Sequence, residues 1–69
     1  MMQQRHFEAI AQAISGIKQE ATIWNSAYGQ EILSALPFVT ERLADMCSRN
    51  YQGAYSSNRT KFLKVALGE

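Results

Sequence analysis

Two side chains of the types that most often carry chemistry occur once each in this sequence, His6 and Cys47. A nucleophilic cysteine needs a neighbouring base, and His6, next to Arg5, is the only histidine that could supply one. A single cysteine excludes an internal disulfide, and a four-ligand zinc site would need carboxylates to complete it. We therefore expect an exposed His6, a Cys47 buried as a small apolar side chain, and no metal.

The acidic residues offer one helix-spaced pair, Glu41 and Asp45, that could act as acid and base. Arg42 and Arg49 lie at neighbouring positions, which favours ion pairs at the solvent surface instead. The sequence contains no glycine-rich phosphate loop, nucleophile elbow or metalloprotease motif. We therefore predict a protein that is not an enzyme and that uses no cofactor.

Tyrosines and cations gather in the last third of the chain. Residues 47–69 carry four basic side chains and one acidic side chain, which gives a net charge of +3. Residues 1–46 carry three basic and five acidic side chains, which gives a net charge of −2. Tyrosine beside arginine or lysine is favoured at protein interfaces and at single-strand stacking sites. The alternative is that the tyrosines cover a small core and the cations lie on a solvated helix face. The candidate binding residues are Arg49, Tyr51, Tyr55, Arg59, Lys61 and Lys64.

Apolar spacing predicts a first helix from about Gln3 to Gln19. Its apolar positions alternate three and four residues apart, and the pattern continues to Trp24. The helical members are Phe7, Ile10, Ile14 and Ile17. The β-branched and capping residues that follow predict a break around residues 21–26.

A second helix is predicted from Asn25 or Ser26 to about Asn50, with Gly53 just beyond its end. Pro37 interrupts it, because proline removes a backbone hydrogen bond and clashes with the preceding turn. The helix either bends there or stops, with another helix opening at Pro37; the uninterrupted apolar pattern favours a bend. That pattern consists of Ile32, Leu36, Val39, Leu43 and Met46.

The stretch 50–58 has the composition of a loop, and residues 59–67 read as a short last helix capped by Ser57 or Asn58 and ended by Gly68. The expected fold is all-α, a small bundle of three to four helices in one domain over residues 1–69. Its last helix should bury Phe62, Val65 and Ala66, and the aromatic residues expected in the core are Phe7, Trp24, Phe38 and Phe62.

A domain of 69 residues buries only about 60% of the surface of its unfolded chain, so it is marginally stable unless a partner helps. The first two helices each have a long apolar face, and the short last helix can cover only part of them. A second copy of the chain would cover the rest, so we predict a homodimer. Its interface would include Ile10, Ile14, Ile17 or Trp24. The absence of a signal-peptide pattern and of an apolar run of about 20 residues predicts a cytoplasmic protein without a membrane span.

Both ends of the chain resemble a widespread group of short, mostly uncharacterised bacteriophage proteins. Those proteins begin with a basic-His-aromatic segment, as Arg5-His6-Phe7 does here, and end in a motif like ADxCxxxNPxFDRxRFxxACG. Ala44-Asp45-Met46-Cys47, Asn50, Phe62-Leu63 and Gly68 match that ending. The sequence departs from it at Tyr51, which replaces the proline, at residues 55–58, and at Leu67, which replaces the late cysteine.

The resemblance implies a phage origin and an accessory role in the host cytoplasm, and it brings no catalytic residues. Together with the lack of catalytic motifs, it leads us to expect a protein that binds a host protein, as an inhibitor of a host defence system. The alternative is a small nucleic-acid-binding or regulatory protein that uses the basic C-terminal third. The two interpretations differ in whether Arg59, Lys61 and Lys64 form one positive surface or are scattered and ion-paired.

Overall fold

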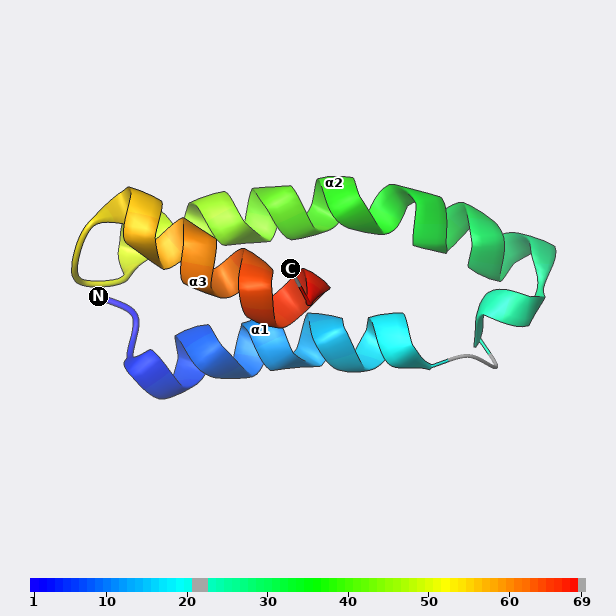
Figure 1. Cartoon of the computed structure of the whole chain (residues 1–69), viewed down its shortest axis with the longest axis horizontal. Coiled ribbons are helices and arrows are strands. Elements are labelled where there is room, and N and C mark those ends of the chain that lie inside the picture. Colours follow the sequence, from blue (N-terminus) through cyan, green and yellow to red (C-terminus); the bar gives the residue numbers. More distant parts are fainter. Residues whose placement is uncertain (21–22, 69) are drawn as a thin grey trace.

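Residues 1–20 and 23–68 are described by the structure, a computed structural model, and over these residues the chain is helical (Figure 1). Three α-helices and one turn of 3-10 helix follow each other along the chain. They are α1 (Gln4–Gln19), η1 (Ile23–Asn25), α2 (Ala27–Asn50) and α3 (Tyr55–Leu67). The expected all-α class is confirmed, and part of the predicted break, residues 21–22, lies outside the described residues.

α1 has the extent that the sequence predicts, and its buried face consists of Phe7, Ala11 and Ile14. Ile10 is half-buried against the core, while Ile17 is exposed. The buried positions recur every three or four residues, so they form one narrow strip along the helix. Ile17, the last helical member of the predicted apolar pattern, lies outside that buried strip.

α2 begins at the predicted cap, because the Ser26 hydroxyl accepts a hydrogen bond of 2.9 Å from the backbone N–H of Gly29. The helix then runs unbroken through Pro37 to Asn50. The alternative of two helices that meet at Pro37 is therefore wrong. The bend at Pro37 stays a prediction.

The buried face of α2 is not the one that its apolar spacing predicts. Leu36 is buried as predicted, but the other buried residues of α2 are small or polar, and they are Gly29, Thr40, Ala44, Cys47 and Ser48. Ile32, Val39 and Met46 are exposed, and Phe38 is 76% exposed, so their expected burial is wrong. Small side chains at the contact let α3 approach α2 closely, and this leaves the larger apolar side chains facing away.

α3 starts at Tyr55, four residues before the predicted start, with Ala54 at the cap position. Phe62 and Ala66 are buried as predicted, whereas Val65 is exposed. Gly68 ends the helix as predicted, since its φ of 74° lies in the left-handed region that favours glycine. The ammonium group of Lys18 on α1 also donates a 2.9 Å hydrogen bond to the carbonyl oxygen of Leu67.

The three α-helices are arranged so that α3 packs against both of the others (Figure 1). α1 and α2 run antiparallel and touch each other much less than either touches α3. Trp24 of η1 is buried, as predicted, and its ring N–H donates a 3.2 Å hydrogen bond to the carbonyl oxygen of Lys18. Ile14 and Trp24 are thus buried within the chain itself, whereas Ile10 is half-buried and Ile17 is exposed, and the predicted homodimer stays a prediction.

Candidate functional site between α1 and α3

A stack of aromatic rings joins the three α-helices near the N-terminus. The ring of Phe7 on α1 lies parallel to that of Tyr51, with centroids 4.6 Å apart. It also meets Phe62 of α3 edge-on, at 5.6 Å and 70°. Phe62 is fully buried, while Tyr51 is half-buried and keeps part of its ring at the surface. These offset and edge contacts are the arrangements that aromatic rings prefer.

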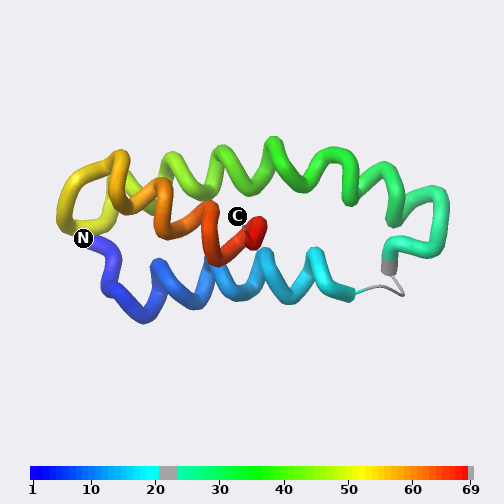
Figure 2. The backbone as a smooth tube through the Cα atoms, viewed as in Figure 1, coloured from blue at the N-terminus to red at the C-terminus, as the bar shows by residue number. Residues whose placement is uncertain are grey.

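Backbone contacts at the N-terminus hold Tyr51 in this stack. The backbone N–H of Met2 donates a 2.7 Å hydrogen bond to the carbonyl oxygen of Asn50, and Met2 forms an isolated bridge with Tyr51. Figure 2 shows the N-terminus lying beside the connection between α2 and α3. The first residues of the chain therefore help to fix the ring of Tyr51 over α1.

The buried amide of Asn58 organises the short connection from α2 to α3. Its Nδ2 lies 3.4, 3.4 and 3.2 Å from the carbonyl oxygens of Ser48, Tyr51 and Gln52. Gly53 completes the turn with a φ of 104°, a conformation that other residues rarely adopt. Asn58 thus lies buried in the first turn of α3, where its amide is a hydrogen-bond donor for backbone carbonyl groups at and after the end of α2. Its predicted role as a helix cap is therefore wrong.

A groove of about 310 Å³ opens beside the aromatic stack, between α1 and α3. Phe7, Ala11, Phe62 and Val65 supply its apolar lining, and Tyr51 closes one end. Lys61 and Lys64 border it on the α3 side. Gln4 and Glu8 border it on the α1 side, where the Gln4 amide donates a 2.9 Å hydrogen bond to the Glu8 carboxylate.

The two lysines are the groove's main electrostatic feature. Both side chains are exposed, and among the described residues neither has an acidic partner within ion-pair distance. They lie three residues apart on one helix, so their charges act on the same side of the groove. The arrangement offers apolar contact along the floor and attraction for a carboxylate along one rim.

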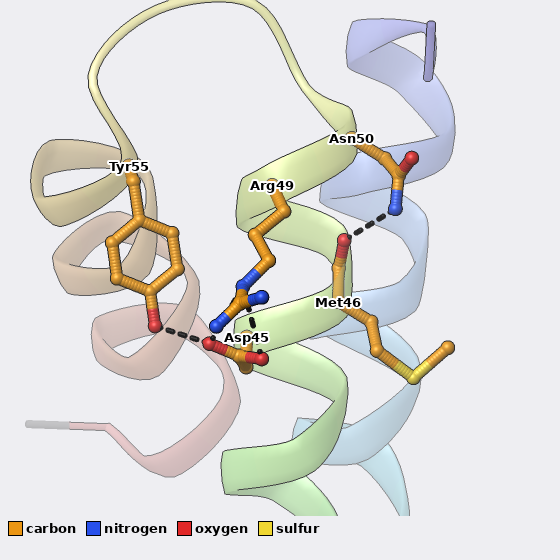
Figure 3. A network of polar contacts seen from close by, with 5 residues as sticks. All are labelled: Asp45, Met46, Arg49, Asn50 and Tyr55. Atoms are coloured by element: carbon orange, nitrogen blue, oxygen red, sulfur yellow. Dashed lines mark hydrogen bonds and ion pairs between the residues drawn. The ribbon is translucent and has the colours of Figure 1, made fainter.

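A second polar cluster joins α2 to α3 around Asp45 (Figure 3). The Tyr55 hydroxyl donates a hydrogen bond to Asp45, and Arg49 Nε lies 3.2 Å from the same carboxylate. The Arg49 guanidinium is also 5.8 Å from the centroid of the Tyr55 ring. The hydrogen bond from Tyr55 and the charges of Arg49 and Arg42 lower the pKa of Asp45 below its ordinary value. The same hydrogen bond raises the pKa of Tyr55.

Arg59 forms a second ion pair with an acidic residue of α2. Its guanidinium donates a 2.7 Å hydrogen bond to the carboxylate of Glu41 on α2, and that bond raises the pKa of Arg59. The acids of α2 therefore lie beside the arginines of the basic C-terminal third. The charge separation along the sequence is partly cancelled in space.

The structure does not bring the six candidate residues together in one site. Tyr51, Lys61 and Lys64 meet at the groove, whereas Arg49 and Arg59 are ion-paired to α2. Arg49 and Tyr55 border a second, more open hollow of about 400 Å³, which Tyr51 also lines together with Ser48 and Gly53.

The sequence does not predict the contribution of α1 to the groove. Gln4, Glu8 and Ala11 give no chemical signal, because ordinary polar and small residues of this kind occur on any amphipathic helix. Val65 was assigned to the core, although its place one turn after Lys61 puts both on the same side of α3.

Cys47 and His6 lie where the sequence predicts. Cys47 is buried in the core, and burial raises the pKa of its thiol above the ordinary value. His6 is exposed on α1. Over residues 1–20 and 23–68, no three side chains of the metal-binding types come together.

Comparisons with known proteins add no relative: the chain matches no family model, no curated protein and no solved structure. Within the described part of the chain, no helix combines the length and the apolar character needed to cross a bilayer.

Proposed function

We propose that this chain is a non-enzymatic, phage-encoded accessory protein that binds a host protein through the groove between α1 and α3 and thereby inhibits a host defence system. The observation that carries the binding proposal is the groove itself, which combines an aromatic floor with two lysines on one rim. Clefts with an apolar lining and a few convergent polar groups are the usual form of a binding site. The resemblance to short phage proteins supports the origin and the host target.

The groove's chemistry indicates which part of a partner it takes. An apolar side chain would pack against Phe7, Phe62 and the exposed edge of Tyr51. Carboxylates beside that side chain would be attracted to Lys61 and Lys64. The bound segment is therefore short, with acidic residues beside one or two large apolar residues, because long-range attraction favours acidic partners for a cationic rim.

The state of Cys47 supports a function without catalysis. A nucleophilic cysteine needs a lowered pKa and access to substrate, whereas this thiol is buried and its pKa is raised. The polar groups that line the groove, an amide, a carboxylate and two ammonium groups, are suited to recognition of a peptide.

Affinity purification from host lysate tests the proposal when three forms of the chain are compared. We expect the wild type to recover one host protein reproducibly, and Lys61→Glu to lose it because the rim charge is reversed. Arg5→Glu is the matched control, since Arg5 is an exposed cation of α1 that does not line the groove. Recovery of no host protein, or an equal loss with both variants, would contradict the proposal.

The inhibitory role has its own test in host cells that carry the defence system to which the recovered protein belongs. Expression of the wild-type chain should weaken defence, and Lys61→Glu should restore it. A recovered protein with no part in defence would keep the binding proposal and overturn the inhibition.

Nucleic acid is the alternative partner, and a gel-shift experiment tests it, while the salt dependence of any binding shows how many cations take part. Two of the four cations in the basic third, Arg49 and Arg59, are held by Asp45 and Glu41. Binding by Lys61 and Lys64 alone would give a log–log salt slope of about −2, whereas all four cations would give about −4. Retardation in a gel-shift experiment at low salt, lost in Lys61→Glu, would favour nucleic acid over a host protein.

A further inference from the structure

The face of α2 that turns away from the core carries a line of exposed, mostly apolar side chains. Their spacing of four, three, four, three and four residues places them in one row along the helix, as in the contact row of a paired helix. This outer stripe of α2 consists of Tyr28, Ile32, Ala35, Val39, Arg42 and Met46, all exposed. A continuous apolar row on a small protein marks a surface that another molecule covers.

We propose that the outer stripe binds a second copy of this chain, with the two α2 helices antiparallel about a two-fold axis near Pro37. In that arrangement Tyr28 faces Met46 of the second copy, and Ala35 faces its Val39. Each contact occurs twice, as a two-fold interface requires. Phe38, 76% exposed beside the stripe, approaches the Phe38 ring of the second copy near the axis.

Charge complementarity identifies the second copy as the occupant. The same register places Arg42 opposite Ile32 of the second copy, and therefore next to its Glu31. Both side chains are exposed, and neither has an ion pair among the described residues. Asp45, which also lies near this end, is already paired with Arg49. A parallel pair of α2 helices would instead place Arg42 against Arg42, which like charges oppose.

The length of the stripe sets the strength of the dimer. From Tyr28 to Met46 it extends roughly 27 Å along the helix axis. Stable dimers bury about 800 Å² on each partner, and a single pair of helices of this length falls below that area. The dimer should therefore dissociate in the micromolar range. The stripe shares no residue with the groove between α1 and α3, so the two surfaces can be tested separately.

Sedimentation equilibrium across the micromolar range measures the dimer directly. The mass should rise with concentration from 7.8 kDa to twice that value. A mass that stays at 7.8 kDa throughout would overturn the proposal and leave the stripe to a different protein.

Two lysine variants locate the interface on the purified chain. Val39→Lys places a charge against Ala35 of the other copy on each side of the axis, so it buries two charges in the apolar contact and should abolish the dimer. Ile17→Lys is the matched control, because Ile17 is a similarly exposed apolar residue on α1. Circular dichroism checks that both variants keep their helices. Equal weakening by both variants would place the interface elsewhere and overturn the proposal.

A charge exchange tests the register without removing any apolar side chain. Glu31→Arg and Arg42→Glu should each raise the dissociation constant of the dimer about tenfold, because each variant alone brings like charges together twice. An equimolar mixture of the two should restore association, since each heterodimer then has two opposite-charge contacts. A mixture that associates no better than either variant alone would overturn the antiparallel register.

Discussion

At the scale of single residues, Asn58 contributes more to this fold than its polar character suggests. Its buried amide nitrogen lies within hydrogen-bond distance of three backbone carbonyls, one in the last turn of α2 and two in the connection that follows, and the turn that it holds also positions Tyr51. A buried carbonyl group that loses its donor lowers the stability of the folded protein, because water cannot reach it to replace the hydrogen bond. The candidate groove therefore depends on a residue that does not line it.

Asn58→Ala should lower the free energy of unfolding by about 2 kcal/mol, because it removes a buried donor from several acceptors. Asn58→Asp keeps the size of the side chain and places an acceptor against those carbonyls, so it should destabilise at least as much. Urea unfolding of the three proteins measures both effects. Native-like stability of Asn58→Asp would show that the shape of the side chain, not its hydrogen bonds, matters at this position.

Thr40 is a buried polar residue whose side chain, unlike that of Asn58, makes no hydrogen bond among the residues that the structure describes. It lies on α2 and is fully buried, its hydroxyl included. Thr40→Val has nearly the same shape and removes the unsatisfied group, so it should stabilise the protein by about 1 kcal/mol. Thr60→Val is the control, because the exposed Thr60 hydroxyl donates a 2.9 Å hydrogen bond to Ser56. Thermal unfolding in which Thr40→Val melts below the wild type would mean that this hydroxyl is satisfied in solution.

The carboxylate of Asp45 gives a prediction that depends on pH. The hydrogen bond from Tyr55 lowers the pKa of Asp45 in the folded protein below its unfolded value. Its stabilising effect is therefore present above the unfolded pKa and disappears as pH falls through the folded pKa. In an NMR titration of the Asp45 carboxyl, Tyr55→Phe should raise the pKa, whereas Tyr28→Phe should leave it unchanged. An unchanged pKa in Tyr55→Phe would exclude the bond.

At the scale of the helices, the sequence predicts where elements lie better than which side of them is buried. The first two helices and their ends follow from Ser26, Gly53 and the spacing of apolar residues, since caps and breakers act locally. The start of α3 was placed too late because Asn58 resembles a cap. Local chemistry cannot reveal that its amide reaches back to α2.

The buried face of α2 could not be predicted from the helix alone. Residues three or four apart recur on more than one side of α2, and the side that carries Ile32, Val39 and Met46 is exposed. Burial depends on how volumes fit across a contact, and the fully buried ring of Phe62 fits against small residues such as Ala44. For the same reason the sequence identified Tyr51, Lys61 and Lys64 but not the part of the groove that α1 supplies.

Pro37 provides a test at this scale. It lies inside α2, where it leaves the carbonyl of Leu33 without its helical donor. Pro37→Ala restores the donor and should raise the free energy of unfolding by about 2 kcal/mol. This value is the gain in helix propensity minus the cost of the greater flexibility of the unfolded chain. Pro37→Gly should gain less, because glycine is a weaker helix former. Urea midpoints of both variants at or below the wild type would contradict a continuous α2.

At the scale of the whole molecule, packing redistributes the charge that the sequence separates. Asp45 and Glu41 of α2 hold Arg49 and Arg59, so among the described residues the cations of the last third without an ion pair are Lys61 and Lys64 at the groove. The outer stripe of α2 lies on different residues. The two proposed contact surfaces, one for a partner and one for a second copy, are therefore separate on this small helical protein.

The most direct measurement of the central claim is photo-crosslinking from the groove in host lysate. A photoreactive phenylalanine analogue at Val65, which lines the groove and is exposed, should crosslink the same host protein that the wild type recovers by affinity purification. The same analogue at Gln12, exposed on α1 outside the groove, should give no such product. A crosslink from Gln12 but not from Val65, or one to nucleic acid alone, would contradict the groove as a protein-binding site.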